Sequence, residues 1–126
     1  MPAEKNFENK VKEYLESQEA WFIKYWGGAK YTKTGIPDIL CCINGYFLAI
    51  EIKGPNGKPS DLQIVNIREI RKAGGIAIVL WPDQYARFEI LCELLKSGSH
   101  YAAVMLQTDC FDEKISVKQK EILYKK

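Results

Sequence analysis

The sequence has 126 residues, 47% of them hydrophobic, and 18 Lys and Arg against 16 Asp and Glu residues give a formal net charge of +2. This length and composition favour one domain with its own apolar core, and the small net charge excludes nucleic-acid binding driven by overall charge alone. Residues 1–10 lack an apolar signal region, and no stretch has the length of a membrane span. We therefore expect a soluble, cytoplasmic protein that does not bind membranes.

The four cysteines show no Cys-x-x-Cys spacing, and three of them fall in or beside apolar runs. We therefore expect small core hydrophobes, with no structural zinc and no disulfide. These residues are Cys41, Cys42, Cys92 and Cys110.

Residues 4–18 are predicted to form an amphipathic helix, because the residues of its buried stripe recur at spacings of three and four. Glu8 lies beside this stripe, one turn before Lys12. On its own, Glu8 is consistent with a solvated residue that the helix macrodipole favours. The stripe consists of Phe7, Val11, Tyr14, Leu15 and Gln18.

A first strand is predicted over residues 20–26, where aromatic and β-branched residues precede the Gly27-Gly28 break. The following loop, residues 27–35, mixes basic and aromatic side chains of the kind that contact a phosphate backbone or stack on a base. A solvated surface loop is equally consistent with this composition. The nucleic-acid-binding candidates in the loop are Lys30, Tyr31 and Lys33.

Residues 35–53 are predicted to form one antiparallel hairpin around the dipeptide Asn44-Gly45, a strong signal for a two-residue type I′ turn. A two-residue turn fixes the pairing register and places Asp38 directly opposite Glu51. Directly opposed residues have Cβ atoms roughly 4.5 to 5.5 Å apart, close enough for two carboxylates to share one ion. Lys53, two residues beyond Glu51, returns to the same face of the strand.

Two opposed carboxylates in an apolar hairpin repel each other, and burial makes each charge costlier. A divalent cation would remove this cost. The alternative is that Asp38 simply starts a strand after Pro37, while Glu51 and Lys53 form the solvated face of an edge strand. The apolar neighbours of Glu51 favour a strand covered on both sides. These neighbours are Ala49, Ile50 and Ile52.

A helix is predicted over residues 61–73, after a turn-rich loop that contains Lys58. Ser60 and Gln63 have the spacing of a capping box, and the Gln63 amide is also placed to reach a site at the end of the preceding strand. Arg68, with Arg71 and Lys72, makes the polar face basic, which fits a solvated face or a nucleic-acid face equally well. The predicted buried stripe is Leu62, Val65, Ile67 and Ile70.

Residues 76–81 are predicted to form a buried strand that lies parallel to the strand over 46–53, through a right-handed crossover. Asp83 is predicted to cap a third helix at about 84–96. The interior residues expected on this helix are Tyr85, Phe88, Leu91, Cys92 and Leu95.

The C-terminal part of the chain is less regular in pattern. His100, the only histidine, is predicted to lie in a loop, residues 101–106 in a short edge strand, and residues 116–124 in a lysine-rich helix. We therefore expect a single domain over 1–126, with a core at about 4–98 and an extension over 99–126.

Three short segments resemble the signature of the PD-(D/E)XK nuclease superfamily, and more closely its virus-type replication-repair branch, the VRR-NUC domain. They are Gly35-Ile36-Pro37-Asp38, Ile50-Glu51-Ile52-Lys53 and Ser60-Asp61-Leu62-Gln63. The resemblance covers about residues 4–82. It implies an α/β fold with a restriction-endonuclease-like αβββαβ core, in which helices flank a mixed sheet.

The resemblance also implies a role for individual residues. Asp38 and Glu51 match the metal ligands, Lys53 the catalytic lysine, Gln63 the helix glutamine of this branch, and Glu8 the glutamate of the first helix. A short chain with no attached helicase resembles the stand-alone versions found in phages, which places it in the cytoplasm of a bacterial host cell.

Hard oxygen ligands such as these carboxylates suit Mg²⁺ or Mn²⁺, and the backbone carbonyl of Ile52 is a further candidate ligand. A bound cation would polarise a phosphoryl oxygen and lower the pKa of its water. Lys53 would orient that water, accept its proton or stabilise transition-state charge, and the sequence does not distinguish these roles.

The expected function is therefore that of a metal-dependent DNA endonuclease acting on branched DNA, such as a Holliday junction or a flap, in replication, recombination or repair. A homodimer is expected because one site cuts one strand. One alternative is a sequence-specific restriction-type nuclease, although the chain has little length to spare for a domain that reads bases. The other is a non-catalytic nucleic-acid-binding module on the same fold, which would not need to retain the acidic pair and the lysine.

Overall fold

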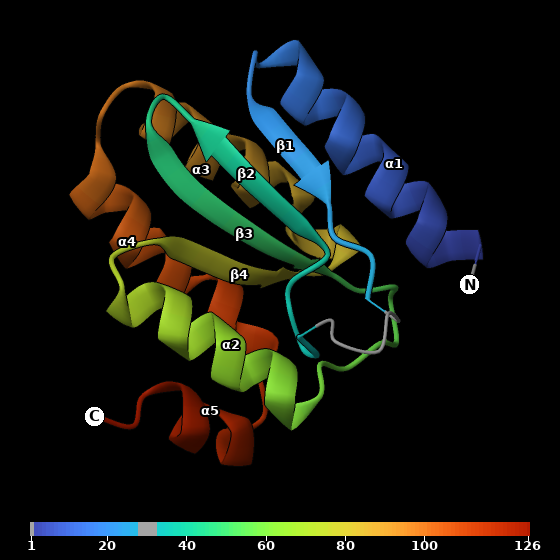
Figure 1. Ribbon diagram of the computed structural model, residues 1–126, viewed down its shortest axis with the longest axis vertical. Helices are drawn as coiled ribbons and strands as arrows, with labels where there is room; N and C mark the ends of the chain where they lie inside the picture. The colour runs from blue at the N-terminus through green and yellow to red at the C-terminus, as the bar shows by residue number, and fades with distance from the viewer. Residues whose placement is uncertain (1, 28–32) are drawn as a thin grey trace.

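A four-stranded mixed sheet lies at the centre of the computed structural model, which describes residues 2–27 and 33–126 (Figure 1). The chain forms one α/β domain, as predicted. Its elements in order are α1 (Pro2–Ser17), β1 (Trp21–Lys24), β2 (Ile39–Ile43), β3 (Tyr46–Ile52), α2 (Asp61–Lys72), β4 (Ile76–Leu80), η1 (Pro82–Gln84), α3 (Tyr85–Lys96), α4 (His100–Asp109), η2 (Phe111–Lys114) and α5 (Val117–Leu123).

The strand order β1-β2-β3-β4 follows the chain, with antiparallel pairing from β1 to β3 and parallel pairing of β3 with β4. Asn44 and Gly45 have φ values of 49° and 82°, as a type I′ turn requires. The predicted register is confirmed, because Ile39 pairs with Ile50 at the far end of the hairpin. Continuing that register by one residue places Asp38 opposite Glu51.

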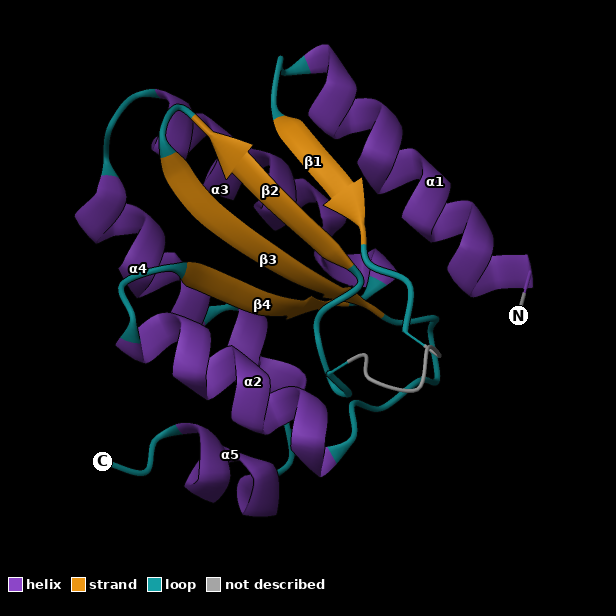
Figure 2. Cartoon of the chain, in the orientation of Figure 1, coloured by secondary structure: helices purple, strands orange, loops and turns teal. Residues whose placement is uncertain are grey.

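Two apolar clusters lie on opposite faces of the sheet. One includes α1, α3 and residues of α4, while the other lies between the β3–β4 half of the sheet, α2 and α5. Figure 2 shows α3 behind the sheet and α2 in front of β4, so that the front of β1 and β2 has no helix over it. Trp21 of β1 is 67% exposed on this uncovered side, and Phe47 of β3 is 45% exposed.

The prediction of an edge strand over residues 101–106 is wrong, because these residues lie in α4. Alanine, methionine and leucine favour helix, and this preference outweighs the short apolar run that indicated a strand. His100 is the first residue of α4 and not a loop residue, and its ring stacks on Tyr46 with 5.2 Å between centroids.

Three smaller predictions are also corrected. Asp83 does not cap α3 but forms an ion pair with Lys114, and the helix is entered through the 3-10 turn η1. Leu62 is exposed, and Ile64 takes a buried place on α2 instead. Cys41 and Cys92 are buried as predicted, whereas Cys42 is exposed; none of the four cysteines forms a disulfide.

The residues after 98 are packed into the core and do not form a separate extension. Phe111, Ile115 and Leu123 are all buried. Arg71 of α2 donates to both carboxylate oxygens of Asp112, each at 2.8 Å, and the Tyr124 hydroxyl donates to one of them at 2.7 Å. The C-terminal segment therefore holds α2 against the sheet.

Candidate functional site

Asp38 lies just before β2, where that strand leaves β3. Its Oδ2 accepts a hydrogen bond from the backbone amide of Ile52 at 2.8 Å, and its own carbonyl accepts one from the amide of Tyr25 at 2.8 Å. Ile39 and Ile50 form the last backbone pair between β2 and β3. The Asp38 carboxylate accepts its hydrogen bond from β3 just beyond this pair. The backbone of the sheet fixes the position of this side chain.

Glu51 is 2% exposed and lies in β3, with β4 beside it. Its Oε2 accepts a hydrogen bond from Gln63 Nε2 at 3.0 Å and lies 3.2 Å from Lys53 Nζ. Its Oε1 is buried and has no hydrogen-bond partner among the described residues. Burial, together with the negative charge of Asp38, raises the pKa of Glu51 to about 8, and Lys53 opposes this shift.

Gln63 has both of the roles that the sequence allowed. Its backbone amide donates to Ser60 Oγ at 3.1 Å, and its side-chain Oε1 accepts from the Ser60 amide at 2.8 Å, which completes the capping box. The remaining Nε2 reaches Glu51. The start of α2 therefore orients the Glu51 carboxylate.

Glu8, the third predicted carboxylate, is held by lysines. Its Oε2 lies 3.1 Å from both Lys5 Nζ and Lys12 Nζ, and its Oε1 accepts from Lys24 Nζ at 2.5 Å. Burial alone would raise the pKa of Glu8, but the three ammonium groups lower it to about 2. Lys24 also lies 3.3 Å from Asp38 Oδ1, so its ammonium bridges Glu8 and Asp38.

Lys24 was not identified from the sequence. The sequence feature that could have indicated Lys24 is its position in an otherwise apolar and aromatic strand. It follows Phe22, which packs on the core, by two residues. Period-2 alternation puts both side chains on the face that α1 covers.

The Asp38–Glu51 pair suits a hard divalent cation, because Glu51 has a buried oxygen without a donor and lies near enough to Asp38 for that carboxylate to raise its pKa. Within residues 2–27 and 33–126, no three His, Cys, Asp or Glu side chains are grouped as a metal site. The predicted third ligand, Glu8, is separated from the pair by Lys24. The Ile52 carbonyl remains a predicted ligand, while the Ile52 amide already orients Asp38.

Gly35 brings the loop before Asp38 close to α2. Its φ is +77°, and a Cβ atom there would lie 2.7 Å from Leu62 Cγ. Asn66, which is buried, donates from Nδ2 to the Thr34 carbonyl at 3.3 Å. This loop is therefore held to the same helix that supplies Gln63.

The described nucleic-acid-binding candidates lie on separate elements. Lys33 and Lys58 are exposed, while Lys30 and Tyr31 lie outside the described residues. Arg68 Nη1 donates to the Ile122 carbonyl at 3.5 Å, and its Nε pairs with Glu69. Arg71 is bound to Asp112 and has a structural role.

Shallow hollows adjoin the Lys53 end of the site. One hollow is lined by residues 54–57 and the start of α1. Two neighbouring hollows share Lys58, Trp81 and Lys114, and one of them extends to Lys118. A Cβ atom on Gly57 would lie 3.3 Å from Lys53 Cδ, so this loop packs on the stem of Lys53. Lys114 and Lys118 were not foreseen as part of a basic surface.

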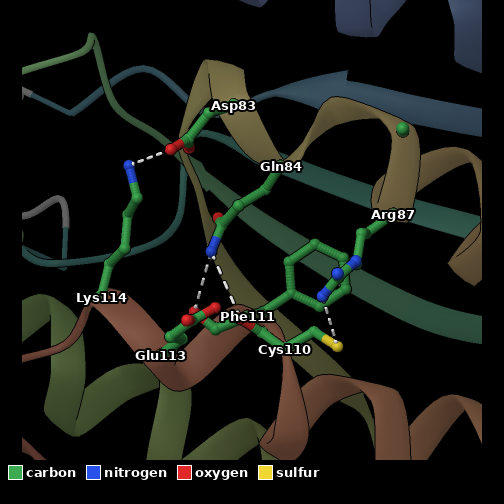
Figure 3. Close-up of a pocket in the computed structure, with 8 residues that line it drawn as sticks. Asp83, Gln84, Arg87, Cys110, Phe111, Glu113 and Lys114 are labelled. Carbon is green, nitrogen blue, oxygen red and sulfur yellow. Dashed lines mark hydrogen bonds and ion pairs between the residues drawn. The ribbon is translucent and has the colours of Figure 1, made fainter.

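Another hollow lies between the start of α3 and η2 (Figure 3). Its polar groups bond to one another: Gln84 Nε2 donates to the carbonyls of Cys110 and Phe111, and Arg87 donates to the Cys110 sulfur at 3.0 Å. Neither the acidic pair nor Gly57, which packs on Lys53, lines it. This hollow therefore takes no part in the candidate site.

A scan against protein-family models, a search of curated proteins and a search of solved structures found no match to this chain. In the described part of the chain, none of the helices combines the length and apolar character needed to cross a membrane.

Proposed function

We propose that the protein is a metal-dependent DNA endonuclease that acts on branched DNA. The observation that carries this proposal is the buried Glu51 Oε1, which has no donor among the described residues, in a carboxyl group whose pKa the neighbouring Asp38 raises. Leaving a buried carboxylate oxygen without a donor is costly unless the arrangement serves a ligand. The adjacent Lys53 and Gln63 give the pair the chemistry of a phosphodiester-cleaving site.

Asp38 and Glu51 would hold Mg²⁺ or Mn²⁺, which supplies Lewis acidity toward the scissile phosphate. Each carboxylate already has one oxygen fixed by the protein: Oδ2 of Asp38 by the Ile52 amide, and Oε2 of Glu51 by Gln63. This preorganisation limits the freedom of both ligands. Lys53 provides a positive charge beside Glu51, where it stabilises negative charge on a phosphate or orients the attacking water.

The hollows near Lys53 support a nucleic-acid substrate. Lys58 and Lys118 line them, together with Lys114, which is paired with Asp83, and a phosphate backbone is bound mainly through lysine and arginine side chains. We propose branched DNA and a homodimer together, because a single site cuts one strand and two symmetric cuts require two sites. The exposed Trp21 and Phe47 offer an apolar surface for self-association.

The test is cleavage of a labelled four-way junction beside flapped, linear duplex and single-stranded DNA, each with Mg²⁺, with Mn²⁺ and with EDTA. Wild type is compared with Lys53→Ala and with Lys96→Ala. Lys96 is an exposed lysine beside the Asn44 turn, at the opposite end of the β2–β3 hairpin, and serves as the matched control.

The proposal predicts metal-dependent cuts that are lost in Lys53→Ala and kept in Lys96→Ala, with the four-way junction or the flap cut best. If a linear duplex is cut at one particular sequence as fast as the branched substrates are cut, the result would support a restriction-type nuclease instead. Tight binding without cleavage of any substrate would show a non-catalytic binding module and overturn the proposal.

A further inference from the structure

Lys24 lies at the end of β1 and is directed toward α1 and the acidic site. Its side chain is 17% exposed, and its ammonium lies 2.5 Å from Glu8 Oε1 and 3.3 Å from Asp38 Oδ1. Two carboxylates from separate elements thus share one fixed positive charge.

The two oxygens of Glu8 have different partners. Lys5 and Lys12 both contact Oε2, while only Lys24 contacts Oε1, the oxygen directed toward Asp38. Removing Lys5 or Lys12 would leave Oε1 and Asp38 bridged as before. Removing the Lys24 charge would leave a pair of carboxylates without a cation between them, much as Asp38 and Glu51 are now.

We propose that the Lys24 ammonium is a built-in cation that occupies the place of a second metal ion between Glu8 and Asp38, so that the site binds one divalent cation, at Asp38 and Glu51. This inference rests on the metal dependence of the proposed function. Lys24 is a positioning residue: it pairs with Glu8 Oε1 and fixes Asp38 Oδ1, while the Ile52 amide fixes Oδ2. Each carboxylate oxygen has two lone pairs, so Asp38 can accept from Lys24 and still ligate the ion.

The number of bound ions tests the proposal without any measurement of activity. Mn²⁺ binding is counted by calorimetry and by the electron paramagnetic resonance signal of free Mn²⁺, with circular dichroism as the check on folding. We expect one ion in wild type, two in Lys24→Met, and one again in the double variant Glu8→Gln with Lys24→Met. Lys24→Arg, which keeps the charge, should bind one ion.

Lys12→Met is the matched control, because it removes an ammonium from Glu8 that does not touch Asp38; it should bind one ion. Two ions in wild type, or one ion in a folded Lys24→Met, would overturn the inference and leave the proposed function standing. No ion in wild type would overturn both. If Lys24→Met does not fold, Lys24→Gln, which keeps a hydrogen-bond donor without the charge, replaces it: two bound ions support the inference, and one contradicts it.

Discussion

The backbone amide of Ile52 donates a 2.8 Å hydrogen bond to the carboxylate of Asp38, across the point where β2 and β3 separate. Asp38 therefore points along the end of β3 instead of into solvent, and it lies against Glu51, the residue before Ile52. The main chain of the hairpin thus brings two negative charges together. The repulsion between these carboxylates and their capacity to bind a cation both lead to measurable effects.

Glu51→Gln should make the metal-free protein more stable. The amide of glutamine carries no charge and can donate to the Asp38 carboxylate, which removes a buried acceptor that has no donor. Its amide oxygen can still accept from Gln63 and Lys53, which contact Glu51 Oε2 in the wild type, so both keep a partner. We expect a gain of roughly 1 to 3 kcal/mol in the free energy of unfolding at about pH 9 in EDTA, measured by urea denaturation. A loss of stability would show that Glu51 is adequately paired without a cation.

The stability of the metal-free wild type should also fall as the pH rises. The pKa of Glu51 is raised from 4.5 to about 8. Between these values the folded protein retains a proton that the unfolded chain has released, so the free energy of unfolding decreases with rising pH through this window. Below about pH 4.5 the group is neutral in both states and its contribution is fully present. Glu51→Gln should lack this part of the pH dependence in the same urea titrations.

Gly35→Ala should disturb the site from the loop before Asp38. The positive φ costs a β-carbon residue about 1 to 2 kcal/mol, and the added atom would meet Leu62 at 2.7 Å. Gly27→Ala is the control, because a Cβ atom there has open space and no positive φ is recorded. Thermal unfolding should show a loss of stability for Gly35→Ala only. Equal behaviour of the two variants would mean that the loop moves freely away from α2.

Asp112→Ala should destabilise the fold by roughly 3 to 5 kcal/mol, because it leaves the part-buried guanidinium of Arg71 without its bidentate partner. Tyr124→Phe removes a single hydrogen bond to the same carboxylate and should cost about 1 kcal/mol. Chemical denaturation of both variants measures the difference. A small effect of Asp112→Ala would imply that the Arg71 guanidinium is adequately solvated without Asp112 and that the ion pair adds little to the fold.

Charge reversal in the hollows beside Lys53 should weaken DNA binding in a salt-dependent manner. Lys58→Glu with Lys118→Glu should reduce the slope of log affinity against log salt by about 2, close to one per lost phosphate contact. Binding to a four-way junction is measured in EDTA by fluorescence anisotropy.

The control for this experiment is Lys10→Glu with Lys96→Glu, which changes the net charge equally on other surfaces. If both double variants lower the slope to the same extent, the effect is one of overall charge and the hollows are not the binding surface.

Much of the fold and part of the site could be predicted from local chemistry. The two-residue turn at Asn44 and Gly45 sets the hairpin register, and the register brings Asp38 to Glu51. The capping box fixes where α2 begins, which brings Gln63 to the same carboxylate. These features depend on neighbours in sequence or on one pairing rule, so few residues determine them.

The remaining features depend on contacts between distant elements. Lys24 acquires its position only when α1 packs beside β1, and no local pattern indicates that it bridges Glu8 and Asp38. The sequence places Arg71 on a basic helix face, but Asp112, 41 residues later, binds its guanidinium. The short apolar run of α4 fits both the helix and the strand period, so its pattern alone does not identify the helix.

Cleavage of a labelled four-way junction in Mg²⁺ by wild type and by Glu51→Gln tests the central claim most directly. The account predicts that wild type cuts and that EDTA stops it, whereas Glu51→Gln, although more stable when metal-free, cuts no faster than the background. Cleavage by Glu51→Gln at the wild-type rate, or cleavage by wild type that persists in EDTA, would contradict the assignment of Asp38 and Glu51 as the metal site of a nuclease.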